Sequence, residues 1–100
     1  MDAAISINGV PIRLTEERWY HITEVRDELA GHYDEVLRTV SEPDFIMRGY
    51  GGALIAMKGI AQDRYLAVVY KEVSREDGFI ITAYPVRRVS RRAIIWRRNR

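Results

Sequence analysis

The sequence RYLAVVYKEV at residues 64–73, followed closely by FIITAYPV at residues 79–86, decides the fold of this chain. Both stretches are rich in Val, Ile and Tyr, which favour strands, and the connection 74–78 is polar and ends in glycine. Together they predict a β-hairpin. Segments 45–47 and 53–58 have the same composition, so we expect an antiparallel sheet of about four strands.

The first half of the chain has a helical period instead. Thr15 precedes two glutamates and apolar residues at helical spacing, which predicts a capped helix over about 15–30 that breaks near Arg26. A second helix follows from about 33 to 41, and Pro43 ends it. Helices that precede an antiparallel meander predict an α+β domain, with the N-terminal helices packed on one face of a C-terminal sheet.

The two ends of the chain are less regular. An Asn-Gly turn between short alternating segments, 5–7 and 10–14, predicts a small hairpin or an extended arm. We assign residues 1–100 to a single domain with a basic tail from about residue 87, because 100 residues suffice for one modest core. Residues 93–96 form either a last strand or the start of a short helix.

Composition excludes several classes of function. The chain has no cysteine, hence no disulfide or thiolate metal site, and no apolar run of the roughly 20 residues that a membrane span requires. The start of the chain lacks the pattern of a signal peptide, so we expect a cytoplasmic protein without a membrane partner. The glycine-rich run 49–52 lacks the residues of a phosphate loop, and we expect no cofactor and no metal.

Charge is distributed unevenly along the chain. Residues 15–44 carry nine acidic side chains and three arginines, a net charge of −6, whereas the chain from residue 45 onward has twelve basic and four acidic side chains, a net +8. Seven arginines lie in the last fourteen residues, where they need either open solvent or an anionic partner. We favour RNA as that partner, contacted by Arg18, Arg64, Tyr70, Arg88, Arg91 and Arg92.

Strand alternation assigns faces to the main hairpin. Residues at 65, 67 and 69 share one face of their strand, which we expect to be core. The open face then carries Tyr70, Glu72, Thr82 and Tyr84, unless a one-residue bulge reverses part of this assignment. Cross-strand packing alone also accounts for these residue types. The residues predicted to be buried are Trp19, Ile22, Val36, Leu37, Val69, Ile81 and Ala83.

The two histidines are candidates for proton transfer. His21 lies three residues after Arg18 on the first predicted helix, and His32 lies at the start of the second. Imidazole exchanges protons near neutral pH, as RNA cleavage requires when a 2′-hydroxyl attacks the adjacent phosphate. Either residue is equally compatible with a surface position or a helix cap, and two histidines alone make no metal-site signature.

Over residues 18–84, the order of motifs resembles the RelE-like part of the barnase, EndoU, colicin and RelE nuclease superfamily, including the BrnT-type toxins. The resemblance rests on the motifs Arg18-Trp19-x-His21-Ile22, Val36-x-x-Thr39-Val40-x-x-Pro43-Asp44-x-Ile46, Arg64-Tyr65-Leu66-x-Val68-Val69-Tyr70-x-Glu72 and Gly78-Phe79-Ile80-Ile81-Thr82-Ala83-Tyr84, together with His32. It implies a RelE/barnase-like α+β endoribonuclease that works without metal, often as the toxin of a toxin–antitoxin pair. His32-Tyr33-Asp34 replaces the His-Pro-Glu of many short relatives, and Tyr84 stands where BrnT-type toxins tend to carry arginine.

We therefore predict metal-independent RNA cleavage, with an antitoxin protein as a further partner. In this hypothesis His21 or His32 acts as general base or acid, and Lys58 and Arg87 stabilise the charge that develops on the phosphate. Thr82 and Tyr84 position the phosphate or stack a base. A non-catalytic RNA-binding module and a protein–protein adaptor that uses an exposed sheet edge are the alternatives.

Overall fold

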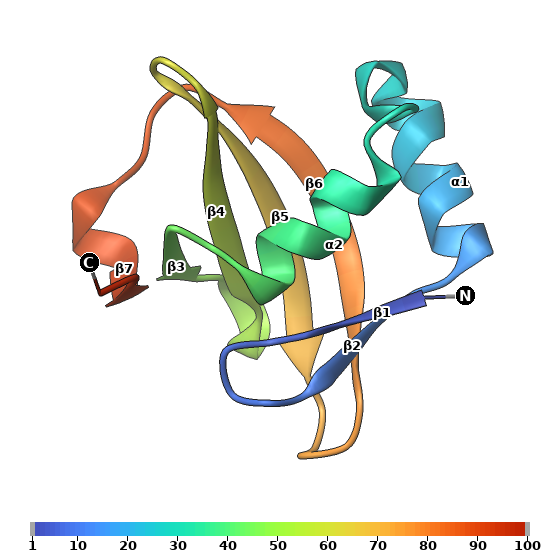
Figure 1. The fold of residues 1–100 in the computed structure, drawn as a ribbon, viewed down its shortest axis with the longest axis horizontal. Coiled ribbons are helices and arrows are strands. Elements are labelled where there is room, and N and C mark those ends of the chain that lie inside the picture. Colours follow the sequence, from blue (N-terminus) through green and yellow to red (C-terminus); the bar gives the residue numbers. More distant parts are fainter. Residues whose placement is uncertain (1, 100) are drawn as a thin grey trace.

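A single sheet organises the described part of the chain, residues 2–99, in the computed structural model (Figure 1). Its strand order is β1-β2-β6-β5-β4-β3-β7, and among the described pairs only β2 and β6 run parallel. The strands are β1 (Asp2–Ile5), β2 (Pro11–Leu14), β3 (Phe45–Arg48), β4 (Leu54–Ala61), β5 (Arg64–Glu72), β6 (Gly78–Val86) and β7 (Ile94–Arg97).

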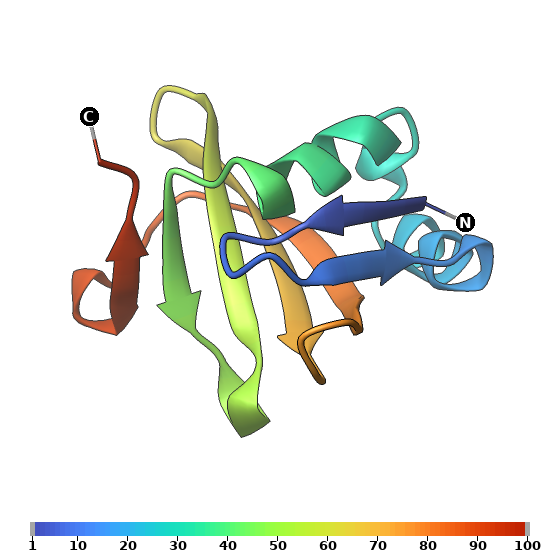
Figure 2. The ribbon, with the colours of Figure 1, turned by 60° about the horizontal axis from the view of Figure 1, so that its bottom comes forward.

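This sheet corrects the predicted fold. The chain is α+β, but the prediction of about four antiparallel strands that follow the helices is wrong, because residues 2–99 form a mixed sheet of seven strands. The N-terminal hairpin β1–β2 joins one edge through β6, and β7 joins the other edge through β3 (Figure 2). These partners are more than 45 residues apart, so no local pattern indicated the pairing.

Gly78 allows the N-terminal hairpin to approach the sheet. Ile12 pairs with Gly78 where β2 meets β6. A Cβ at position 78 would lie 2.5 Å from the Ile12 side chain and 2.6 Å from the Lys71 carbonyl oxygen, closer than any real contact. The missing side chain therefore makes room for the parallel strand.

The helices follow their sequence signals closely. Helix α1 (Glu16–Val25) begins after Thr15, whose hydroxyl accepts a hydrogen bond from the Arg18 amide, and it stops at Arg26 as predicted. A short 3₁₀ turn, Asp27–Leu29, replaces the rest of the expected first helix. Helix α2 (Tyr33–Ser41) has the predicted bounds. Within residues 2–99, neither helix has the length and apolar character to span a bilayer.

The main core lies between the helices and one face of the sheet, which we call the covered face. Trp19 and Tyr33 meet edge to face above it, with ring centroids 5.2 Å apart. The buried residues of this core are Ala4, Val10, Ile12, Leu14, Ile22, Leu29, Val36, Val40, Ala56, Leu66, Val68, Tyr70, Ile80 and Ala83. Both the N-terminal hairpin and the helices thus contribute to one hydrophobic core.

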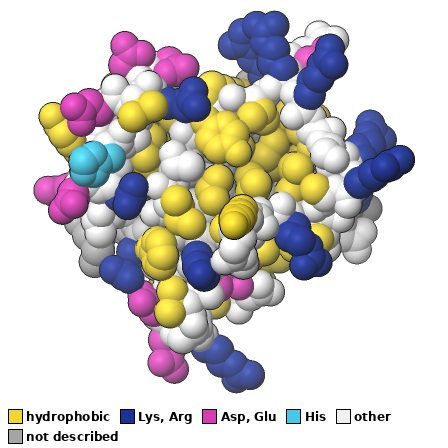
Figure 3. All heavy atoms as spheres, turned by 180° about the vertical axis from the view of Figure 1, so that it is seen from behind, with side chains coloured by type: hydrophobic (Ala, Val, Ile, Leu, Met, Phe, Trp, Pro, Cys, Tyr) yellow, Lys and Arg dark blue, Asp and Glu magenta, His cyan; other side chains and the backbone are white. Residues whose placement is uncertain are grey.

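The opposite face of the sheet, which we call the back face, holds a second apolar cluster that neither helix of residues 2–99 covers. Phe45, Met57 and Ala67 are buried within it. Around them lie partly buried side chains, visible as a continuous apolar surface in Figure 3: Met47, Ile55, Tyr65, Tyr84, Val86, Val89 and Ile94. The sheet therefore has an apolar surface on each side.

The face assignment of β5 was wrong, because residues 66, 68 and 70 face the helices. Val69 lies on the back face and is only partly buried, opposite Thr82. β5 alternates regularly, but its register with β6 shifts at Val69/Tyr70, where Ile81 is the extra residue of β6, so that Ile80 and Ala83 both belong to the main core. Among the residues predicted to be buried, Ile22, Val36 and Ala83 are buried, whereas Trp19, Leu37, Val69 and Ile81 are partly exposed.

The C-terminal segment is structured up to its described end. After a 3₁₀ turn, Arg91–Ala93, strand β7 pairs with β3, so the expected basic tail contains an edge strand. Arg98 then donates hydrogen bonds to the carbonyl oxygens of Glu42 and Pro43. Lys58 Nζ also donates to Glu42 O, at 2.8 Å. Two cations thereby satisfy the carboxyl end of α2.

Candidate functional site

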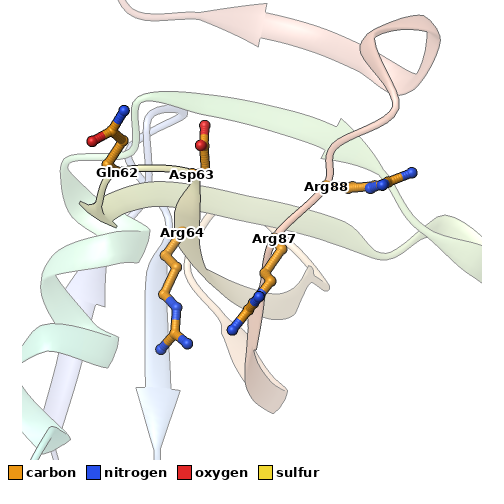
Figure 4. Close-up of a pocket in the computed structure, with 5 residues that line it drawn as sticks. All are labelled: Gln62, Asp63, Arg64, Arg87 and Arg88. Atoms are coloured by element: carbon orange, nitrogen blue, oxygen red, sulfur yellow. The ribbon is translucent and has the colours of Figure 1, made fainter.

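Two arginines meet at one corner of the sheet, where β5 begins and β6 ends. Tyr65 pairs with Val86, so Arg64 and Arg87 lie on neighbouring strands one residue beyond this pair. Their side chains extend in the same direction, whereas Arg88 points elsewhere (Figure 4). The cavity that they border measures about 570 Å³ and is lined by Gln62, Asp63, Arg64, Arg87 and Arg88.

Arg64 also lines two further cavities, which therefore adjoin the first. One, of about 490 Å³, lies between the sheet and the start of α2 and is lined by Glu28, Leu29, His32, Glu35, Ile60, Arg64, Leu66 and Pro85. The other, of about 230 Å³, connects Glu28 with Arg64 and Arg87. We call this concave region the Arg64 corner. Its lining combines three guanidinium groups, one imidazole and three carboxylates.

His32 and Glu35 form a pair at the helix end of this corner. His32 occupies the N-cap position of α2, and its Nδ1 lies 2.5 Å from Glu35 Oε2 one turn later. An ionised carboxylate can only accept a hydrogen bond, so Nδ1 is the donor, and in the neutral ring Nε2 keeps its lone pair. The contact fixes both the tautomer and the orientation of the ring, as in histidines that act as general bases. Both side chains are about half exposed, which leaves them accessible to a substrate.

The chemistry available at the Arg64 corner is anion binding next to a proton acceptor. Guanidinium groups match the geometry of phosphate oxygens and keep their charge at any physiological pH. An imidazole that is held by a carboxylate can accept a proton from a hydroxyl group. Within residues 2–99, no group of three His, Asp or Glu side chains is placed to hold a metal ion.

Four predicted site residues, His32, Arg64, Arg87 and Arg88, line this region, but others lie elsewhere. His21 is exposed on α1, where its ring meets that of Tyr20 at 6.0 Å. Lys58 binds the end of α2, as described above. Neither residue is among those that line the three cavities of the corner.

Two further predicted site residues, Thr82 and Tyr84, do not line the cavity that contains His32. Thr82 and Tyr84 lie on the back face, opposite Val69 and Ala67. The Arg26 guanidinium lies 5.6 Å from the centre of the Tyr84 ring, a cation–π distance. Tyr84 therefore contributes to the apolar surface of Figure 3.

The residues predicted to contact RNA also lie in different parts of the molecule. Arg88 lines the first cavity of the corner, but its side chain points away from Arg64 (Figure 4). Arg18 is exposed on α1 and lines none of the three cavities of the corner, and its amide belongs to the helix cap. Arg91 and Arg92 are exposed in the 3₁₀ turn before β7.

Tyr70 was wrongly predicted to contact RNA. Its side chain is fully buried in the main core, with 0% exposure. The hydroxyl has no hydrogen-bond partner among the described residues. Burial raises the pKa of this hydroxyl far above its ordinary value, and the nearby charge of Glu72 raises it further. The core thus keeps a neutral phenol that cannot reach a ligand.

Sequence reasoning missed the three carboxylates of the corner, Glu28, Glu35 and Asp63. Glu35 follows His32 by three residues, which is the spacing of neighbours on a helix, and this signal was present in the sequence. Glu28 gave no comparable signal, because only the 3₁₀ turn after α1 brings it to the ends of β5 and β6.

Comparison of the chain with protein-family models, with curated proteins and with solved structures gives no match. The resemblance to RelE-like nucleases stays a prediction from the sequence. Any functional assignment rests on the geometry of the Arg64 corner.

Proposed function

We propose that this protein cleaves RNA at the Arg64 corner by attack of a 2′-hydroxyl on the adjacent phosphate. The observation that carries the proposal is the His32–Glu35 pair on a cavity that Arg64 also lines. It supplies an oriented base beside a phosphate-binding group. The +8 charge of the chain after residue 44 adds a general attraction for polyanions.

Each residue of the corner has a distinct role in this proposal. His32 Nε2 accepts the proton of the 2′-hydroxyl, and Glu35 stabilises the imidazolium that results. Arg64 and Arg87 bind the nonbridging oxygens, whose negative charge grows as the 2′-oxygen bonds to phosphorus. The bond to the 5′-oxygen then breaks, and that oxygen takes a proton from water. The products are a 2′,3′-cyclic phosphate and a 5′-hydroxyl end.

Cleavage of a short fluorescent single-stranded RNA tests the proposal. His32→Ala should lower the rate by about 10²-fold or more, since it removes the general base. His21→Ala is the matched control and should leave the rate unchanged, because His21 lies outside the corner. A DNA strand of the same sequence should stay intact because it has no 2′-hydroxyl. A chelator should have no effect, because no step is assigned to a metal.

The arginine pair also fits a second function, binding of RNA without cleavage. Arg64 and Arg87 hold a phosphate whether or not His32 removes a proton. In that case the RNA stays intact, while binding weakens with added salt and with Arg64→Ala but not with His32→Ala. An intact RNA, or equal rates for the parent and His32→Ala, would rule out the catalytic proposal.

A further inference from the structure

Basic side chains surround the apolar surface of the back face, as Figure 3 shows. Arg87 and Arg88 separate Val86 from Val89 in the chain, and two more arginines, Arg91 and Arg92, lie between Val89 and Ile94. These arginines are exposed. An apolar centre with a cationic border is complementary to an apolar surface that carries acidic side chains.

The chain itself contains such a surface on α1. Glu17, Tyr20 and Glu24 follow helical spacing along the solvent side of this helix, opposite Ile22, which is buried in the core, and the exposed Val25 ends the helix next to Glu24. Tyr20 is 63% exposed and Val25 is 79% exposed, so two large apolar side chains stand in water between carboxylates. We call these four residues the α1 stripe. Nothing within the same described chain covers it.

We infer that two copies of this protein associate head to tail, with the α1 stripe of one copy on the back face of the next. Ile22 anchors α1 in its own core, so the stripe cannot fold back onto the back face of its own chain. A symmetric contact between two back faces would oppose arginine with arginine, which is unfavourable. A contact between different surfaces pairs acid with base and covers both apolar areas.

Head-to-tail contacts leave a free stripe at one end and a free back face at the other. Such an assembly either closes into a ring or grows into an open chain. Its mass should rise with protein concentration and fall with added salt, because the border of the interface is ionic. Arg87 belongs both to the arginine border and to the Arg64 corner, but the test of association is separate from RNA cleavage, since neither the α1 stripe nor Val89 lines the corner.

Sedimentation velocity of the full chain, freed of nucleic acid by nuclease and high salt, tests the inference. At low salt, the wild-type protein should sediment as more than a monomer. Tyr20→Lys with Val25→Lys removes the stripe, and Val89→Glu places a carboxylate in the back-face cluster; each variant alone should be monomeric. Val73→Lys replaces an exposed apolar residue outside both surfaces and should associate like the parent.

A mixture of the two monomeric variants distinguishes head-to-tail from symmetric association. The double-lysine variant keeps an intact back face and the Val89→Glu variant keeps an intact stripe, so together they should form a 1:1 dimer that grows no further. Circular dichroism checks that both variants fold. A wild-type monomer at the highest soluble concentration, a mixture that stays monomeric, or association that disappears with the nucleic acid would each overturn the inference.

Discussion

The two faces of the central strands differ in what covers them, although both are apolar. Val68 is fully buried beneath the helices, whereas its neighbour Val69 is partly exposed on the back face. Tyr70 and Tyr84 show the same contrast, one within the main core and one at the surface. A continuous apolar run such as residues 65–70 therefore predicts a strand with two apolar faces, while the packing of other elements decides which face becomes the interior.

The largest expected difference between the faces is at the two tyrosines. Tyr70→Ala should lower the free energy of unfolding by about 3–5 kcal/mol, as for other large buried aromatics, because it leaves a cavity in the core. Tyr84→Ala should lower it by less than about 1.5 kcal/mol, because its ring is already partly in water. Urea unfolding at 25 °C measures both, and equal losses would contradict the assignment of the faces.

A smaller difference is expected between adjacent valines. Val68→Ala should lower the free energy of unfolding by about 2 kcal/mol, since it removes two fully buried methyl groups. Val69→Ala should cost less than about 1 kcal/mol, because the back face lacks a covering layer. Each variant is the control for the other, since both remove the same atoms from the same strand. The reverse order would mean that β5 has the opposite orientation.

The smallest expected effect at neutral pH is that of Tyr70→Phe. The hydroxyl is buried without a partner, so its removal should leave stability within about 0.5 kcal/mol of the parent or raise it. Burial raises the pKa of Tyr70 in the folded state. The free energy of unfolding is therefore unaffected by ionisation of this tyrosine below about pH 10, where the phenol is neutral in both states. Above that pH the unfolded tyrosine ionises while the folded one does not, and the free energy of unfolding falls.

The parent should therefore lose stability relative to Tyr70→Phe by about 1.4 kcal/mol per pH unit above pH 10. Unfolding of the two proteins in urea at pH 8 and pH 11 measures the difference. Other groups that titrate in this range, including Tyr33, are common to both proteins and cancel. A constant difference across this range would place the Tyr70 hydroxyl in contact with solvent.

The sequence indicated part of the candidate site. Arg64, Arg87 and His32 could be named as polar side chains at element boundaries that suit phosphate chemistry. Their shared location could not be derived, because it depends on how the start of α2 lies against the ends of β5 and β6. Lys58 shows the converse: its charge suggested a phosphate contact, but the end of α2 lies within its reach and binds it.

Local chemistry in the sequence determined the elements of this protein. Thr15 capped α1, Pro43 followed the end of α2, and β-branched residues formed strands at the predicted places, because each signal acts over a few residues. Only the tertiary structure decided that the N-terminal hairpin and β7 extend the sheet, and that Tyr70 points inward. Those outcomes depend on pairing between distant segments and on which face of β5 the helices cover.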